Sequence, residues 1–462
     1  MKFLYSLFLF IFVMPSLGAL SPPYEKVFQD PDLNYVFDLK ALPVIRLEVS
    51  QEQWNTLLRA FDLKSDTQQV VKAQFTFTKN GQTEVLDDIG LRLRGNTSRY
   101  RPEGRKPALH KPENTPWNHA HYGLKFSEFD SKTRFHSLEN MTLKFFKDDP
   151  SYVREIYGYD LMKRFGVWLV PWASYARVFI RVTGDSKEGY LGIYRMVEAV
   201  DEVFIEKRFG KKDDGDLWKC SVKNRIAASL TNESLTLGAG ISTDTQDFAY
   251  DLKTNKKQFP LALGRLKQWT QELNSFKGIE LQEWIQKKLG GDLFLRTLAV
   301  LATLGSFDDY WNGGNNFYFY LDSHEKAWFI PFDLDNIMGT SVVLEDTGTQ
   351  NPLTWGPPSG RPLVNKLLEF PEYTQLYSQY LKDIIDPQKG LFLEKSAQGL
   401  FRNWHELIQA FVDNDTGRDD VIEDLPADWS DHGNYRLWEE GRDTRNFFQT
   451  RTESLRQALF LP

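Results

Sequence analysis

Residues 308–339 read DDYWNGGNNFYFYLDSHEKAWFIPFDLDNIMG, and this stretch predicts a β-hairpin whose ends carry oxygen-bearing side chains. An aromatic run at 317–321 follows a turn rich in Gly and Asn, and a second run at 327–332 leads into Asp333 and Asp335. Asp and Asn also end strands and form turns for purely local reasons. Several of them around one hairpin, beside a Gly-Gly pair, favour a site for a hard cation such as Mg²⁺, itself a holder of phosphates.

The chain before the hairpin is dominated by strand patterns. Asn80-Gly81 separates two alternating runs, which is a strong hairpin signal. Residues 99–121 are basic and contain Pro and His, as expected of an exposed loop. Beyond Asp201 we expect mainly helices apart from the hairpin at 316–332. The strands expected before Asp201 cover residues 44–49, 73–78, 90–94, 123–126, 140–146, 174–181 and 189–197.

One helix is well marked within this β-rich part. Asp149 can cap it, Pro150 suits its first position, and Gly166 ends it. Apolar residues at helical spacing predict the face that it buries. They are Val153, Ile156, Tyr157, Leu161 and Phe165.

Four stretches of the chain follow one another in a recognisable order. They are LRLRGNTS at 91–98 with YGLKF at 122–126, DPSYVRE at 149–155, YLGIYRMVE at 190–198 followed by Asp201, and the hairpin itself. Together they resemble the CotH kinase family (spore coat protein H-like), an atypical branch of the protein-kinase fold. Phe332 stands where the family usually has Trp, a mild departure. The matching stretches run from about residue 92 to 451.

The resemblance implies an α+β, two-lobed, protein-kinase-like fold. Residues 20–200 would form a β-rich N-lobe with one key helix, which cradles the nucleotide. Residues 201–462 would form a mainly helical C-lobe that carries the β-hairpin and the catalytic and metal-binding residues. We expect ATP and Mg²⁺ or Mn²⁺ as cofactors, because phosphoryl transfer needs a cationic cradle, one or two metal ions and a carboxylate at the acceptor hydroxyl.

The resemblance also assigns roles around the hairpin. Asp308 would be the catalytic carboxylate, with Asp309 as its close competitor. Asn316, with Asn315 as the alternative, would offer a carboxamide oxygen to the metal. The main metal ligand would be Asp333. Asp335 would be either a second metal ligand or a helix cap.

On the phosphate side, a kinase pairs a strand Lys with a Glu of the following helix. Glu155 is the natural helix partner. The family pattern favours Lys125 as the strand Lys over Lys144, although Lys144 is nearer to the helix in sequence.

The remaining cofactor-binding candidates lie in a loop and a linker. Arg94, Gly95 and Ser98 could close over phosphates through backbone N–H groups and hydroxyls. Glu198 would lie at the linker between lobes, where backbone groups can pair with an adenine edge, or it could cap the helix that begins near Asp201. No ordinary P-loop sequence occurs.

The first 19 residues have the pattern of a signal peptide. Lys2 precedes an apolar run at 3–14, and small residues follow up to Ala19. The run is shorter than the ~20 residues that span a bilayer. We therefore expect an exported protein, secreted or periplasmic, with no membrane span after cleavage.

Composition narrows the class of function. Lys and Arg number 56 against 63 Asp and Glu, and this mildly acidic balance argues against a nucleic-acid partner. Cys220 is the single cysteine, so the chain forms no internal disulfide. The leading hypothesis is a monomeric kinase that phosphorylates Ser or Thr of exported proteins. Alternatives are nucleotidyl transfer by the same site and an adhesin-like binding protein that keeps the fold but not the activity. A further alternative is a glycosidase that uses two of the carboxylates around Asp308 and Asp333 with aromatic stacking, since aromatic residues make up 14% of the chain.

Overall fold

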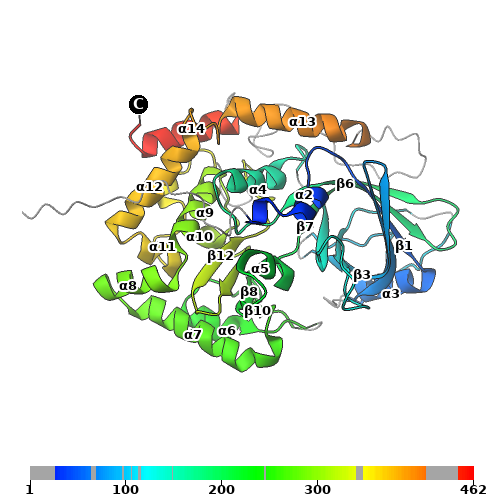
Figure 1. Ribbon diagram of the computed structural model, residues 1–462, viewed down its shortest axis with the longest axis horizontal. Coiled ribbons are helices and arrows are strands. Elements are labelled where there is room, and N and C mark those ends of the chain that lie inside the picture. Colours follow the sequence, from blue (N-terminus) through cyan, green and yellow to red (C-terminus); the bar gives the residue numbers. More distant parts are fainter. Residues whose placement is uncertain are drawn as a thin grey trace, which may run out of the picture.

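The computed structural model describes residues 26–63, 69–95, 98–105, 107–112, 116–147, 149–243, 246–339, 347–412 and 446–461. The expected signal peptide at 1–19 lies outside these ranges. Within them the chain forms a sheet-rich N-terminal part and a mainly helical C-terminal part, as Figure 1 shows. Mixed α and β content was expected. The kinase-like relation of the two parts remains a prediction.

The N-terminal part is a closed seven-stranded barrel with the strand order β1-β2-β3-β4-β5-β7-β6. Neighbouring strands are antiparallel except β1 and β6, which pair in parallel and close the barrel. Closure was not predicted, because the pairing of Val44 with Arg177 joins segments far apart in sequence. The strands are β1 (Val44–Val49), β2 (Val71–Lys79), β3 (Gln82–Arg94), β4 (His121–Lys125), β5 (Asn140–Phe145), β6 (Ala173–Val182) and β7 (Gly189–Glu198).

Alternation along the strands fills the barrel with apolar side chains. In β2 every second residue is buried, and the rings of Phe75 and Phe77 pack against Phe135 with centroids 5.0 and 4.9 Å apart. Residues between the buried ones point outward, as the two-residue period of a strand requires. The outward-facing residues of β3, β4 and β5 therefore remain available for a site. Helices α2 (Pro31–Val36) and α3 (Gln51–Asp62) belong to this part.

Helix α4 (Arg154–Arg164) begins later than its sequence pattern indicates. Val153 is the N-cap, so the prediction that Asp149 occupies the cap position was wrong. The Asp149 carboxylate nevertheless accepts the N–H of Arg154, the first helical residue, at 3.2 Å, and it forms a buried ion pair with the Arg154 guanidinium at 2.6 Å. The predicted apolar face is buried, and it packs in the same hydrophobic cluster as the helices of the C-terminal part.

The C-terminal part contains more sheet than expected. The predicted hairpin, β11 (Phe317–Leu321) and β12 (Ala327–Pro331), belongs to a five-stranded sheet with the order β12-β11-β8-β10-β9. The additional strands are short, which explains why periodicity did not reveal them. They are β8 (Asp216–Cys220), β9 (Ala239–Gly240) and β10 (Tyr250–Leu252).

Most helices of the C-terminal part lie around this sheet in the part of Figure 1 opposite the barrel, whereas α13 extends towards the barrel and contacts β7. Long helix α9 packs against α12 and β12. The helices are α5 (Glu202–Phe209), α6 (Asn232–Gly238), α7 (Phe259–Ser275), α8 (Gly278–Lys288), α9 (Gly291–Thr303), α10 (Tyr310–Gly313), α11 (Pro362–Leu367), α12 (Pro371–Ile385), α13 (Glu394–Val412) and α14 (Phe447–Ala458).

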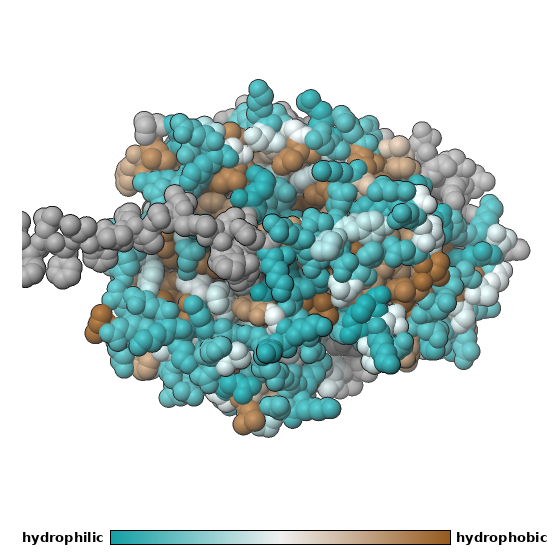
Figure 2. Space-filling view, in the orientation of Figure 1, coloured by the Kyte–Doolittle hydropathy of each residue, from teal (hydrophilic) through white to brown (hydrophobic). Residues whose placement is uncertain are grey.

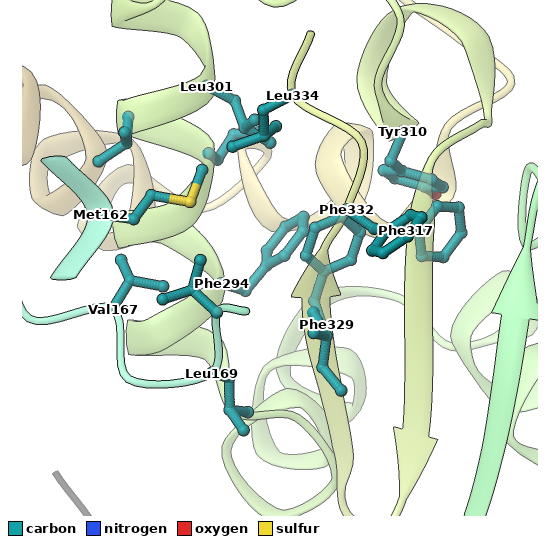
Figure 3. Packing of buried hydrophobic residues seen from close by; sticks show 14 of the residues in the cluster. Met162, Val167, Leu169, Phe294, Leu301, Tyr310, Phe317, Phe329, Phe332 and Leu334 are labelled. Atoms are coloured by element: carbon teal, nitrogen blue, oxygen red, sulfur yellow. The ribbon is translucent and has the colours of Figure 1, made fainter. Parts of the chain in front are cut away.

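Aromatic packing holds the hairpin rigidly against the helices. Phe317 and Phe329 stack across the two strands with their centroids 5.0 Å apart, and Phe294 of α9 meets Phe329 edge-on at 5.2 Å. Figure 3 shows these rings together with Tyr310 and with Val167, which follows α4. A site at the end of this hairpin is thus supported by a well-packed core.

The face in Figure 2 is mostly hydrophilic, with hydrophobic residues scattered among polar ones. Among the described residues, no helix combines the length and apolar character needed to cross a membrane.

Candidate active site

The polar end of the hairpin is fixed by the backbone. Phe332 donates its N–H to the Asn316 carbonyl at 3.1 Å, so that Asn316 and Asp333 lie at the same end of the two strands. Both have left-handed backbones, with φ of 54° and 60°. Non-glycine residues adopt this conformation uncommonly, and they gather at functional sites, where the surrounding packing maintains it.

The Lys144 ammonium on β5 joins three carboxylates. It lies 2.9 Å from a Glu155 oxygen on α4, and it also contacts Asp333 directly and Asp335 at 3.6 Å. Only 9% of the Lys144 side chain is exposed, against 35% for Asp333 and 26% for Asp335. The two aspartates can therefore still be reached by a ligand.

Glu155 is held by two further partners that the sequence did not single out. Arg195 on β7 lies 2.8 Å from a Glu155 oxygen. Tyr159, one helical turn after Glu155, donates its hydroxyl proton to Glu155 at 3.2 Å and accepts the N–H of Asp333 at 3.1 Å. This hydroxyl links α4 directly to the end of the hairpin.

The charges of this cluster compensate one another. Desolvation alone would lower the pKa of Lys144, but Asp333, Asp335 and Glu155 outweigh it and raise that pKa, so the ammonium stays charged. For the carboxyl of Asp333, desolvation acts in the other direction and would raise the pKa, but the positive charge of Lys144 outweighs it and the pKa is lowered. Asp335 differs, because desolvation raises its pKa and the attraction of Lys144 does not fully offset this.

A row of nitrogen-bearing side chains crosses the outside of the barrel. Arg94 lies opposite His121, and Lys144 lies opposite Arg195. Tyr122 pairs with Leu143, which makes His121 the neighbour of Lys144. Burial first, and then the charges of Lys144 and Arg195, lower the pKa of His121 well below its usual value.

Neutral His121 fits its hydrogen bond, because its Nδ1 accepts the N–H of Phe145 at 3.2 Å. The row therefore carries positive charge at Arg94, Lys144 and Arg195, separated by a neutral ring. Glu155 pairs with both Lys144 and Arg195, so Arg94 is the cation of this row that has no carboxylate partner among the described residues.

Asp308 and Asp309 differ in what they can reach. Asp308 accepts hydrogen bonds from the side-chain amides of Asn315 at 2.8 Å and Asn316 at 2.9 Å, and it is only partly buried. Asp309 is buried, caps α10 through the N–H of Asn312, and has one oxygen without a hydrogen-bond partner among the described residues. Asp308 is thus the more accessible carboxylate.

Burial raises the pKa of both carboxyls. For Asp308 the negative charge of Asp333 contributes to the increase, after burial. For Asp309 the pKa reaches about 7, mainly because of burial.

The hairpin end offers oxygen ligands that fit Mg²⁺. Asn316 uses its amide nitrogen on Asp308, which turns its oxygen to the other side, and Asp333 and Asp335 add carboxylates. Within the described ranges, no group of three or more His, Cys, Asp or Glu side chains is arranged as a metal site. Mg²⁺ needs no such cage, since one or two carboxylates plus substrate phosphates often bind it.

Two candidates lie elsewhere than expected. Lys125, favoured over Lys144 as the partner of Glu155, instead pairs with Glu128 at 2.7 Å, and Lys144 takes the position at Glu155. Glu198 is 1% exposed, and both of its carboxylate oxygens bind Arg208. Its own N–H donates to the Trp172 carbonyl, so neither group is directed at a ligand.

Glu198 does not cap the following helix either, because Asp201 accepts the N–H of Phe204 there. Asp335 is likewise not a helix cap, since no helix begins in the four described residues after it. Its proximity to Lys144 leaves the role of second metal ligand open.

Gly95 and Ser98 lie at the end of β3, beside Arg94. Gly95 has a φ of 108°, and a Cβ on it would come within 2.9 Å of the Ser98 carbonyl oxygen. Only glycine permits this close backbone turn. Residues 96 and 97 of the loop lie outside the described residues.

The family model described as "CotH kinase protein" matches residues 91–455. The chain belongs to the CotH kinase family. A search of curated proteins found no match. Membership in the CotH family suggests a kinase-like function and the use of ATP and a divalent metal.

Arg195, Tyr159 and His121 are the site residues that sequence reasoning missed. Arg195 lies within one of the CotH-like stretches, and Tyr159 follows Glu155 by one helical turn, so both had a usable signal. His121 was noted only as part of a His-rich loop. Its adjacency to Lys144 depends on strand register, which the sequence alone does not give.

Proposed function

We propose that this CotH-family protein is an exported, metal-dependent kinase that transfers the γ-phosphate of ATP to Ser or Thr hydroxyls of exported proteins. One observation carries the proposal: the Lys144 ammonium pairs with Glu155 of α4 and contacts Asp333 at the hairpin end. Kinases use a strand Lys paired with a helix Glu, together with a metal-binding Asp, to hold phosphates.

Each remaining requirement of phosphoryl transfer has a candidate. Asp308 would orient the acceptor hydroxyl and accept its proton, and Asn315 and Asn316 fix the carboxylate for that role. Arg94 would bind phosphate oxygens from the barrel. Asp333, Asn316 and Asp335 would hold Mg²⁺ or Mn²⁺, which when bound neutralises charge on the phosphates.

A two-lobed kinase-like arrangement is part of the proposal. In its favour, the described residues form two hydrophobic clusters, one inside the barrel and one shared by α4 and the C-terminal elements. The candidate residues come from both: Lys144 from the barrel, Glu155 from α4, and Asp333 from the hairpin. A site where the two parts meet could respond to small movements of one part relative to the other.

Export rests on the sequence pattern of the first 19 residues. Edman sequencing of the native protein should find an N-terminus near residue 19 or 20. An intact Met1 on cytoplasmic protein would contradict export without affecting the kinase proposal.

The proposed reaction is tested with ATP labelled on either the γ- or the α-phosphate, Mg²⁺ or Mn²⁺, and a generic acidic protein as acceptor. We expect the γ-label, and not the α-label, on Ser or Thr of the acceptor or of the enzyme itself. Transfer of the α-label would instead show nucleotidyl transfer. If ATP neither binds nor reacts with any divalent metal, the chain is better regarded as a binding protein that retains the fold.

A further inference from the structure

A lysine on the five-stranded sheet has no role in the site as described so far. Lys219 on β8 lies opposite Tyr318 on one side and opposite Asp251 on the other. Directly paired residues of antiparallel strands point to the same face. The Tyr318 ring meets Phe332 edge-on at 5.3 Å, and Phe332 directly precedes Asp333, so Lys219 lies on the face of the sheet next to the hairpin end.

The carboxylate nearest to Lys219 in the sheet is already engaged. One Asp251 oxygen accepts the N–H of Ser242 at 2.9 Å, and the other pairs with Lys253. Among the described residues, no carboxylate lies within ion-pair distance of the Lys219 ammonium, which has only the Phe332 ring at 5.7 Å. Phe332 immediately precedes Asp333.

The surroundings of Lys219 are strongly positive. Burial lowers its pKa to about 7, and the charges of Arg94, Lys253 and Lys223 contribute, whereas Asp333 acts in the opposite direction. Arg94 of the barrel and Asp333 of the hairpin are thus among the charges that act on the Lys219 ammonium. Lys144 differs from Lys219, because three carboxylates neutralise it.

We propose that Lys219, together with Arg94, binds the terminal phosphates of the nucleotide as a second cationic arm of the site, independent of the Lys144–Glu155 pair. A partly buried ammonium without a carboxylate partner is costly until an anion arrives. The proximity of Lys219 to Asp333 places this arm near the proposed metal end of the phosphates. The assignment to a nucleotide rests on the proposed function; the anion site itself does not.

A purely structural role for Lys219 predicts something different. If the contact with Phe332 were its whole function, removing the charge would change stability and leave anion binding unaltered. Lys326 provides a matched control, since its ammonium lies over the Trp328 ring at 5.0 Å, on the same hairpin but away from Asn316 and Asp333.

The experiment is calorimetric titration of wild type, Lys219→Met, Lys219→Arg and Lys326→Met with tripolyphosphate, ATP and adenosine, each with Mg²⁺. Loss of one charge-assisted contact should weaken binding of tripolyphosphate and ATP to Lys219→Met by about 10- to 100-fold. Adenosine binding should not change. Lys219→Arg should retain most of the affinity, and Lys326→Met all of it.

Equal tripolyphosphate affinity of wild type and Lys219→Met would overturn the proposal, as would a wild type that binds no tripolyphosphate. Should Lys219→Met fail to fold by circular dichroism, Lys219→Gln replaces it in the same titration. The two proposals can fail separately. Tripolyphosphate binding that depends on Lys219, without transfer from ATP, would leave the anion site and refute the kinase. If wild type transfers phosphate from ATP but Lys219→Met binds tripolyphosphate as tightly as wild type, the kinase proposal stands and the proposed role of Lys219 is refuted.

Discussion

The Lys144 ammonium lies 2.9 and 3.0 Å from the two carboxylate oxygens of Glu155. Because the same ammonium contacts Asp333, one side chain connects a barrel strand, helix α4 and the end of the hairpin. The pair is therefore both a structural link and the centre of the proposed phosphate site.

Replacing Lys144 by Met should reduce phosphate transfer by at least ~100-fold, since it removes a fixed charge from the transition state. Stability should fall by about 1–3 kcal/mol, because Glu155 loses one buried partner and keeps Arg195. Lys125→Met is the control, and its activity should stay near that of wild type. Labelled-phosphate transfer and urea unfolding measure the two effects. A larger loss in Lys125→Met than in Lys144→Met would reverse the assignment.

Asp308→Asn should lower turnover by about 100- to 10,000-fold and hardly change ATP affinity, because a base acts only on the way to the transition state. Asp309→Asn should keep most of the turnover, since the carboxamide oxygen can still accept the N–H of Asn312. Steady-state kinetics beside an ATP titration separates these effects. If Asp309→Asn is the inactive variant, the catalytic role passes to Asp309.

Asp309 should also make stability depend on pH. Its pKa is about 7 in the folded protein and ~4 in the unfolded chain, so folding takes up a proton between these values. The contribution of this proton uptake to the free energy of unfolding is fully present below pH 4 and is lost as pH rises towards 7. Asp309→Asn removes it, so the unfolding free energy of the variant should fall less than that of wild type between pH 4 and 7. Parallel pH profiles from urea unfolding would contradict this.

Asp333→Asn should abolish the metal dependence of ATP binding, because it removes the charge that both the metal and Lys144 need. Titration of ATP with and without Mn²⁺ measures this for the variant and for wild type. Asp322→Asn is a suitable control at the opposite end of the hairpin, where Asp322 accepts the Trp328 indole N–H. Metal-enhanced ATP binding that survives in Asp333→Asn would place the metal elsewhere.

Glu198→Ala should lower the unfolding free energy by about 3–5 kcal/mol, because it leaves the buried Arg208 guanidinium without its counter-ion. ATP affinity of the folded variant should match that of wild type. Glu188→Ala breaks the partly exposed pair with Arg46 and should cost less than about 1 kcal/mol. Weakened ATP binding in Glu198→Ala at a temperature where it is fully folded would restore the nucleotide-binding role.

Local sequence signals predicted the hairpin and the apolar face of α4, because turn residues and periodicity act over a few positions. The closure of the barrel by β1 and β6 could not be predicted, because it depends on which distant strands meet. For the same reason, the sequence could not show whether Lys125 or Lys144 is the partner of Glu155, because strand pairing determines this. Lys144 reaches Glu155 because it lies opposite Arg195, whereas Lys125 lies opposite Asn140 at the other end of its strand.

Along β3, β4 and β5, residues alternate between two roles, because one side of each strand faces the barrel interior and the other faces outward. Leu91, Tyr122 and Leu143 fill the barrel, while Arg94, His121 and Lys144 from the same strands build the site. Substitutions at the outward positions would alter the proposed anion site without disturbing the packed interior. The barrel could therefore diverge towards other phosphate-bearing ligands through changes at every second residue, with its foldability intact.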